Sequence, residues 1–370
     1  MNDSPRSGIA FLGAMNLDTV VVGPPGEEVF AHFTESNYSP YTEQILSDGA
    51  ADELAQSLAD RAMDQLGGSA FNVIRCLLPF GRILPLSFVG CAGRAGAKWP
   101  HIDFLENSSV DTSLCRRSEM PPARSISFAH DGDRSLFTSV GASAEIADHI
   151  SDHYDEIVRF LTRHNAVHVT SILDEASTGA IGRVLASAVN VRKDLVVSVD
   201  PGAYWASNSH AAAKYVISQA TMLHVNVQEF EGLGSRVGRE PDRFVAARVL
   251  SQMRAGAVCT LFVRRHSSVS VYIGLPGSDP SEIAVDNDDV VRVSSVVDAT
   301  GAGDTFTAGV LLALASSETR AVVATRLGVA FARSKIAHVG PATHADILNS
   351  YRSVLGEVVL DGRRITDEGN

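Results

Sequence analysis

The stretch 298-DATGAGDTFTAGVLLALAS-316 places an acid on each side of three small residues and then runs into an apolar segment. Gly301, Ala302 and Gly303 carry almost no side chain, so their backbone N–H groups can approach a ligand closely. The apolar run predicts a buried helix, and the first N–H groups and partial positive charge of a helix favour a bound phosphate or a developing anion. We therefore predict an anion hole at the start of this helix.

Asp304 lies at the same helix terminus, where its carboxylate would face a phosphoryl group bound there. A carboxylate in that position can accept the proton of an attacking substrate hydroxyl, which is the role of a general base in phosphoryl transfer. The alternative is a tight Gly-Ala-Gly turn followed by an ordinary acid in the first turn of a helix. The stretch alone leaves both interpretations open.

The rest of the chain alternates β-prone runs with helical stretches rich in Ala, Leu and Val, such as 178–191 and 243–254. This alternation predicts an α/β fold with a mostly parallel central sheet, helices on both faces and ligands at the carboxyl ends of the strands. The strands we expect lie at residues 8–15, 82–90, 166–172, 194–201, 222–227, 257–263 and 268–274.

Two segments interrupt the alternation. In the first, Leu54, Leu58 and Ala62 have helical spacing and predict one amphipathic helix. In the second, two β-prone runs flank the dipeptide Asp131-Gly132, which is a strong hairpin signal. We expect both to form a small β-rich lid. The lid segments are then 24–66 and 123–142, the α/β core comprises 8–23, 67–122 and 143–355, and the C-terminal tail is 356–370.

The composition limits the cellular partners. Lys and Arg together number 31 and Asp and Glu 43, which gives a net charge of −12 and opposes binding to nucleic acid or anionic lipid. The four cysteines are far apart without Cys-x-x-Cys spacing, and the N-terminal residues are too polar for a signal peptide. No apolar run approaches the roughly 20 residues that cross a bilayer. We expect a cytoplasmic protein without nucleic-acid or membrane partners.

Four motifs in order along the chain resemble the ribokinase-like (PfkB) carbohydrate kinase family. They are 13-GAMNLDTV-20, 67-GGSAFNVIRCL-77, 226-NVQE-229 and 298-DATGAGD-304, and the resemblance extends from about Gly8 to about Gly340. It implies a ribokinase-like three-layer core with a lid. It also implies transfer of a phosphoryl group from ATP, with Mg²⁺, to a hydroxyl of a small sugar or nucleoside.

The resemblance also implies roles for individual residues. Asp304 would be the base, with Gly301, Ala302 and Gly303 as the anion hole. The substrate would contact Asn16, Asp18, Gly67, Gly68 and Asn72. ATP would contact Asn226, Glu229 and Thr260, with Asn226 and Glu229 organising Mg²⁺ through water, and Asp298 is a candidate ligand of an activating K⁺.

The chain also departs from the family pattern. Ser69 and Ala70 follow the paired glycines where many sugar kinases have Lys and Gly, and Arg94 stands where the family commonly has an acid. These differences leave the substrate open. Phe262 replaces a glycine in the segment 260–262 that would let the backbone approach ATP, so we expect a reshaped nucleotide pocket.

Two alternatives to a sugar or nucleoside kinase remain. A kinase of an already phosphorylated sugar would need Arg94, Arg124 or Arg134 to supply positive charge. A family member that binds a ligand without catalysis would not need the base and the Asn-x-x-Glu motif, both of which this chain has. The expected partner is a small sugar or nucleoside, with a homodimer through the lid as an option. The lid aromatics, which could stack on a base or a sugar or form lid core, are Phe30, Phe33, Phe128 and Phe137.

Overall fold

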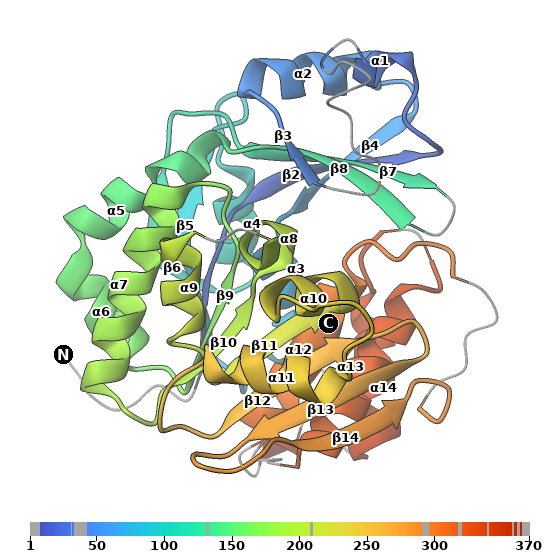
Figure 1. The fold of residues 1–370 in the computed structure, drawn as a ribbon. Helices are drawn as coiled ribbons and strands as arrows, with labels where there is room; N and C mark the ends of the chain where they lie inside the picture. The colour runs from blue at the N-terminus through green and yellow to red at the C-terminus, as the bar shows by residue number, and fades with distance from the viewer. Residues whose placement is uncertain are drawn as a thin grey trace.

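The computed structural model divides the chain into a large sheet and a smaller one, with helices packed around the large sheet (Figure 1). A further pair of short strands, β15 (Val359–Leu360) and β16 (Arg363–Arg364), lies in the C-terminal tail. The residues described are 8–30, 32, 43–130, 133–207, 210–290, 296–316, 320–338, 340–356, 359–360 and 363–364.

The large sheet has the strand order β14-β13-β12-β11-β10-β9-β1-β5-β6. Neighbours from β12 to β6 are parallel, and β13 and β14 extend one edge in antiparallel fashion. Parallel strands covered on both faces form continuous apolar runs, and every residue of β9 (Ala166–Thr170) is buried. The other strands are β1 (Ile9–Leu12), β5 (Leu86–Ala92), β6 (Asp111–Arg117), β10 (Val196–Asp200), β11 (Met222–Asn226), β12 (Cys259–Arg264), β13 (Ser268–Gly274) and β14 (Ser281–Asp286).

Helices cover both faces of the large sheet, so the core has three layers (Figure 1). Alternate residues of β1 divide between the two faces: Ala10 and Leu12 pack in one hydrophobic cluster, and Ile9 and Phe11 pack in the other. The first cluster takes in α5 (Ile146–Asp152), α6 (Tyr154–Leu161), α7 (Glu175–Val191), α8 (Gly202–Ser207), α9 (Ala211–Ile217), α10 (Val227–Leu233) and α11 (Asp242–Ser251). The second takes in α3 (Ser69–Leu77), α4 (Pro100–Asn107), α12 (Ala302–Ala315), α13 (Ala321–Lys335) and α14 (His344–Leu355).

The smaller sheet has the order β3-β8-β7-β2-β4 and forms the lid at the top of Figure 1. One side of this sheet is covered by α2, whose Leu54 packs with Ile126, Phe128 and Phe137 in a separate hydrophobic cluster. The rings of Phe128 and Phe137 pack edge to face with their centroids 5.8 Å apart, so these two aromatics form part of the lid core. The lid elements are β2 (Asn16–Val22), α1 (Glu27–Phe30), β3 (Glu43–Ile45), α2 (Asp48–Ser57), β4 (Ala62–Gly67), β7 (Ala123–His130) and β8 (Asp133–Ser139).

The three-layer α/β core and the small β-rich lid are confirmed, and each predicted strand overlaps an observed one. Antiparallel pairing of β7 with β8 also confirms the hairpin, although its turn, Asp131-Gly132, lies outside the described residues, as do Phe33 and the side chains of Phe30 and Arg134. Apart from the segment 16–22, the predicted boundaries between core and lid remain predictions. A homodimer through the lid also remains a prediction.

Two details of the prediction are wrong. The segment 16–22 was assigned to the core, but β2 pairs with β4 and β7 and therefore belongs to the lid sheet. The predicted helix ends at Ser57, and Ala62 begins β4. Leu54 and Leu58 are buried on the lid core as helical spacing requires, and the chain turns after them, so Ala62 packs against the same core from β4 and not from the helix.

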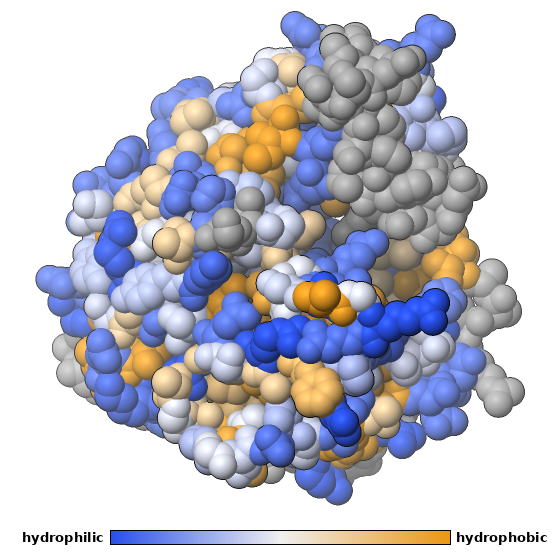
Figure 2. Space-filling view, in the orientation of Figure 1, coloured by the Kyte–Doolittle hydropathy of each residue, from blue (hydrophilic) through white to orange (hydrophobic). Residues whose placement is uncertain are grey.

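Hydrophilic and hydrophobic residues are interspersed on the face of the molecule in Figure 2, and hydrophilic ones predominate over its described part. Among the helices of the described segments, none is long and apolar enough to cross a membrane.

Candidate active site

A cavity of about 370 Å³ lies where the lid faces the carboxyl ends of the core strands. The lid contributes residues of β2, β3, β7 and β8, and the core contributes the loops that follow β9, β10 and β11 together with the starts of α3 and α12. An open α/β sheet binds its ligands at this edge, because the strand ends there lead into irregular loops and helix N-termini.

The start of α12 forms one wall of the cavity. Gly301 is the N-cap of this helix with a left-handed φ of 76°, a conformation that glycine adopts at little cost. Gly301 and Gly303 line the cavity. Ala302 does not line it, and its N–H donates to the carbonyl of Ala299 at 3.1 Å. The structure therefore brings two of the three predicted anion-hole residues to the cavity.

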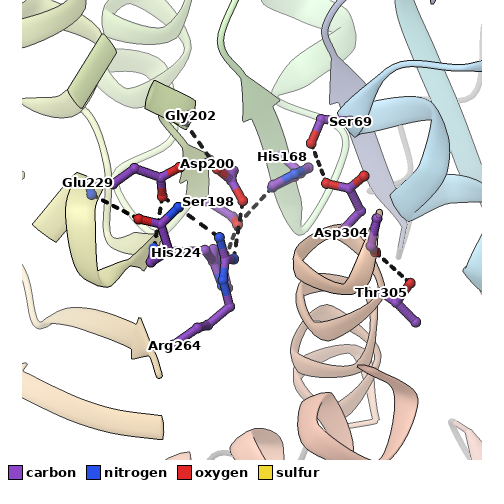
Figure 3. A network of polar contacts seen from close by, with 12 residues as sticks. Ser69, His168, Ser198, Asp200, Gly202, His224, Glu229, Arg264, Asp304 and Thr305 are labelled. Carbon is purple, nitrogen blue, oxygen red and sulfur yellow. Dashed lines mark hydrogen bonds and ion pairs between the residues drawn. The ribbon is translucent and has the colours of Figure 1, made fainter. Parts of the chain in front are cut away.

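Asp304 also lines the cavity, in the first turn of α12. Its carboxylate accepts a hydrogen bond of 3.0 Å from the side-chain amide of Asn72 and one from the hydroxyl of Ser69, both at the start of α3. Figure 3 shows Ser69 and Asp304 pointing toward one another. These bonds fix the orientation of the carboxylate relative to the cavity.

The lid end of the cavity carries Asn16 and Asp18, both on β2, with Ser125 and Ser127 of β7 beside them. These side chains offer hydrogen bonds to hydroxyl groups. β1 ends at Leu12, so Asp18 is held by the lid sheet and not by the first strand of the core.

The paired glycines act on this end of the cavity in different ways. A β-carbon on Gly67 would overlap the carboxylate of Asp18, so the glycine leaves room for that side chain. Gly68 lines the cavity as the N-cap of α3 with a φ of 99°, and a β-carbon there would collide with the carbonyl of Ala14. Gly67 itself does not line the cavity.

Two carboxylates and an arginine lie at the end of the cavity opposite the lid. Arg264, the last residue of β12, lies 3.2 Å from Oδ2 of Asp200 and 3.8 Å from Oε2 of Glu229 (Figure 3). A β-carbon on Gly303 would lie 3.2 Å from the guanidinium, so this cation sits beside the first turn of α12. Burial would lower the pKa of Arg264, but the two carboxylates outweigh burial and raise it, so the side chain stays charged.

Asn226 and Glu229 form a capping box at the start of α10. Oδ1 of Asn226 accepts from the N–H of Glu229 at 2.9 Å, and Oε2 of Glu229 accepts from the N–H of Asn226 at 2.8 Å. Both residues line the cavity, but the described residues contain no group of three or more His, Cys, Asp or Glu side chains that could hold a metal. Carboxylate and amide oxygens are ligand types that suit Mg²⁺, which usually keeps several waters at nucleotide sites.

Two residues of the predicted nucleotide segment do not reach the cavity. Thr260 lies four residues before Arg264 on β12, about 13 Å from its carboxyl end at the usual strand rise. The ring of Phe262 is 1% exposed and stacks on His224 with centroids 5.0 Å apart. Phe262 therefore fills the core instead of reshaping the cavity directly.

Asp298 is also outside the residues that line the cavity. Its carboxylate oxygen Oδ2 lies 2.6 Å from Nζ of Lys335 and its backbone carbonyl accepts from the same ammonium at 2.9 Å. The oxygens that would bind K⁺ there are thus engaged by a cation of the chain itself.

Of the arginines considered for a substrate phosphate, Arg94 and Arg124 do not line the cavity, and the side chain of Arg134 lies outside the described residues. Arg94 pairs with Glu119 on the surface, and Arg124 pairs with Asp52 and Asp64 on the lid. Arg264 is the one cationic side chain among the described residues that line the cavity.

Sequence reasoning missed two side chains of the site. Ser69 enters only as a departure from the family pattern, and its bond to Asp304 joins residues 235 positions apart, so no local pattern signals it. Arg264 follows Phe262 by two residues, and a charged residue at the carboxyl end of an apolar strand is a recognisable signal for this edge of the sheet.

Comparison with known proteins identifies the family of this chain and supports its fold. The sequence pattern of the pfkB family carbohydrate kinases matches residues 39–347. Adenosine kinase from Schistosoma mansoni in complex with 2-fluoroadenosine has a similar fold, with a TM-score of 0.75 at 13% identity over 92% of this chain and 98% of that one.

Two bacterial structures are similar over comparable lengths. Adenosine kinase from Sinorhizobium meliloti has a TM-score of 0.72 at 16% identity over 94% of this chain and 99% of that chain. Ribokinase from Thermotoga maritima has a TM-score of 0.64 at 16% identity over the same shares. No curated protein sequence matches this chain significantly. With a family pattern covering most of its length and a ribokinase-like fold, the chain belongs to the pfkB family of carbohydrate kinases.

Proposed function

We propose that this kinase transfers the γ-phosphoryl group of ATP to a hydroxyl of an uncharged sugar or nucleoside. The observation that carries the proposal is the position of Asp304, which lines the cavity between the hydroxyl-binding side chains of the lid and the glycines at the start of α12. A base held between the acceptor and the anion site is what phosphoryl transfer to a hydroxyl requires.

The proposed reaction transfers one proton, forms one bond to phosphorus and breaks another. The acceptor oxygen attacks the γ-phosphorus and gives its proton to the carboxylate of Asp304, while the bond from that phosphorus to the β,γ-bridging oxygen breaks and ADP leaves. Ser69 and Asn72 hold the carboxylate during this step by the hydrogen bonds they donate to it. Positioning of this kind contributes to the rate because the reacting atoms meet in one geometry.

The charge of the transferring group is balanced at the other end of the cavity. Backbone N–H groups at Gly301 and Gly303 and the guanidinium of Arg264 stabilise the phosphoryl oxygens. Glu229 and Asn226 would hold Mg²⁺ through water, and the ion would supply further positive charge to the phosphates when bound.

The charge of the cavity favours an acceptor without a phosphate. The lid end is lined by Asn16, Asp18 and two serines, and the only lining cation described, Arg264, lies at the transfer end beside Gly303. A phosphorylated sugar would place its dianion next to the carboxylate of Asp18 with no described cation lining that end. This argues for a neutral polyol.

A second cavity favours a nucleoside over a free sugar. It has a volume of about 360 Å³ and shares five lining residues with the first, which are Glu43, Ala203, Asn226, Gln228 and Glu229. It is lined by apolar residues from both lid and core, among them Ile45, Leu173 and Tyr204, which suit a flat base attached to a sugar in the first cavity. The adenosine kinases of similar fold support this choice.

A coupled assay of ADP release over nucleosides, pentoses, hexoses and their phosphates tests the proposal. We expect ATP-dependent turnover with at least one nucleoside at a kcat/KM above that of the corresponding free pentose. Turnover confined to phosphorylated sugars would contradict the neutral acceptor, and turnover with free sugars alone would contradict the nucleoside. An absence of ADP release with every acceptor would contradict the kinase reaction itself.

A further inference from the structure

Lys335, the last residue of α13, is a buried cation outside the cavity. It is 2% exposed, and lysine is almost never buried to this extent unless it is paired. Its Nζ donates to Oδ2 of Asp298 at 2.6 Å and to the backbone carbonyl of Asp298 at 2.9 Å. One ammonium group therefore binds both a side chain and the main chain of the same residue.

Asp298 is tied to its surroundings on its other side as well. Oδ1 accepts from the N–H of Thr300 at 2.8 Å and Oδ2 accepts from the N–H of Gly340 at 3.3 Å. Burial raises the pKa of Asp298, but the hydrogen bonds from Lys335 and Thr300 outweigh burial and hold the pKa below its ordinary value. The pair is thus an ion pair that joins three segments of the chain.

The segment that this ion pair holds leads directly into the candidate active site. Ala299, Thr300 and Gly301 line the cavity, and Gly301 is the N-cap of α12. The distance between the lysine and this loop is set by the packing of α13 on α12. A β-carbon on Gly309 of α12 would lie 2.7 Å from the carbonyl of Leu327 on α13, so the two backbones are in close contact there.

A dissociable monovalent cation does not fit beside Asp298. Such an ion would bind carbonyl and carboxylate oxygens, and the backbone carbonyl and Oδ2 of Asp298 are both bonded to the Lys335 ammonium. An ammonium group carries the same charge as K⁺ and satisfies the same oxygens by donating hydrogen bonds. The structure therefore disagrees with the K⁺ site suggested by sequence resemblance.

We propose that Lys335 is a positioning residue whose ammonium permanently takes the place of an activating monovalent cation, so that the kinase works without K⁺. The inference rests on the proposed kinase function, because it assigns to the lysine the task of holding the loop 299–301 in shape for phosphoryl transfer. The lysine itself does not line the cavity.

The first test compares turnover of the unaltered protein in KCl and in choline chloride at equal ionic strength. We expect equal kcat and equal KM in the two salts. A loss of turnover without K⁺ would overturn the proposal, and this comparison needs no variant.

The second test uses Lys335→Met, which keeps most of the apolar stem of the side chain and removes its charge. We expect kcat to fall by up to about 100-fold, since a small misplacement of a catalytic loop can cost that much. K⁺ or NH₄⁺ should restore part of the loss in the variant. Arg333→Met is the matched control, because Arg333 lies in the same last turn of α13 and pairs with an exposed partner, Asp288. Full turnover of Lys335→Met in choline chloride would overturn the proposal.

A melting measurement separates this inference from the kinase proposal. K⁺ should raise the melting temperature of Lys335→Met relative to choline and leave that of the unaltered protein unchanged, whether or not an acceptor has been found. If neither K⁺ nor NH₄⁺ changes the melting temperature of the variant, the proposal that the lysine takes the place of a cation is overturned. If the variant does not fold, the salt comparison on the unaltered protein decides.

Discussion

The side-chain amide of Asn72 donates a hydrogen bond of 3.0 Å to Oδ2 of Asp304, and thereby joins the start of α3 to the start of α12. The two residues are far apart in the sequence, and Ser69 donates to the other carboxylate oxygen. A carboxylate held at both oxygens keeps one orientation toward the cavity. The contact therefore links the two-glycine motif to the C-terminal signature.

Replacing Asn72 by Ala should lower kcat and leave the KM for ATP nearly unchanged, because the base loses a donor that orients it. A hydrogen bond to a charged group contributes about 1.5 to 3 kcal/mol, so we expect a loss of roughly 10- to 150-fold. Steady-state kinetics measure it, with Asn190→Ala as a control on the exposed end of α7. A selective rise in the KM for ATP would place Asn72 at the nucleotide instead.

Replacing Arg264 by Met should reduce kcat and weaken ATP binding, because the transferring phosphoryl oxygens lose the cation beside Gly303. Removing a charged group that stabilises developing charge costs roughly 10²- to 10³-fold in kcat. Arg265→Met is the matched control, since Arg265 pairs with Asp242 and does not line the cavity. Equal kinetic losses in the two variants would argue against a specific role for Arg264.

Replacing Gly67 by Ala should impair acceptor binding without changing ATP affinity. The added β-carbon would overlap the carboxylate of Asp18 and displace it from the cavity. We expect kcat/KM for the acceptor to fall roughly 10- to 150-fold, as in Asp18→Ala, where a bond to a charged group is lost. Gly49→Ala is the control, because a β-carbon there meets no atom within 4 Å. Unchanged acceptor kinetics with a lower melting temperature would make Asp18 a structural residue.

The free energy of unfolding should fall as the pH is lowered from about 6.5 to about 4. Burial lowers the pKa of His101 and His168 to about 4, so the folded state binds fewer protons than the unfolded state in this range. Stability is then fully present above the unfolded pKa of 6.5 and is lost on acidification, by up to roughly 3 kcal/mol for each histidine. Urea unfolding at several pH values measures it. If the free energy of unfolding of His168→Asn depends on pH as steeply as that of the unaltered protein, His168 does not cause the loss of stability in acid.

The regular parts of the fold could be predicted from the sequence because each depends on local pattern. Continuous apolar runs such as 166–172 become buried parallel strands, and the apolar run after Gly303 becomes the buried α12. The failures depend on pairing between distant segments. Nothing in the local sequence shows that Asn16–Val22 pairs with β4 and β7, or that the chain reverses before Ala62.

The site was predictable where one short motif carries the whole arrangement. The glycine N-cap, Asp304 and the capping box of Asn226 with Glu229 all lie within single motifs. The contacts between motifs could not be predicted from the sequence. They include the bond from Ser69 to Asp304 and the ion pair of Lys335 with Asp298. Such pairs form only when helices from distant parts of the chain pack together.

The kinetics of Asp304→Asn test the central claim most directly. The amide keeps the shape of the side chain and removes its ability to accept the proton, so the account predicts a fall in kcat of roughly 10²- to 10⁴-fold. The melting temperature and the affinity for ATP should stay close to those of the unaltered protein. Near-normal turnover of Asp304→Asn with the best acceptor would contradict the assignment of Asp304 as the base.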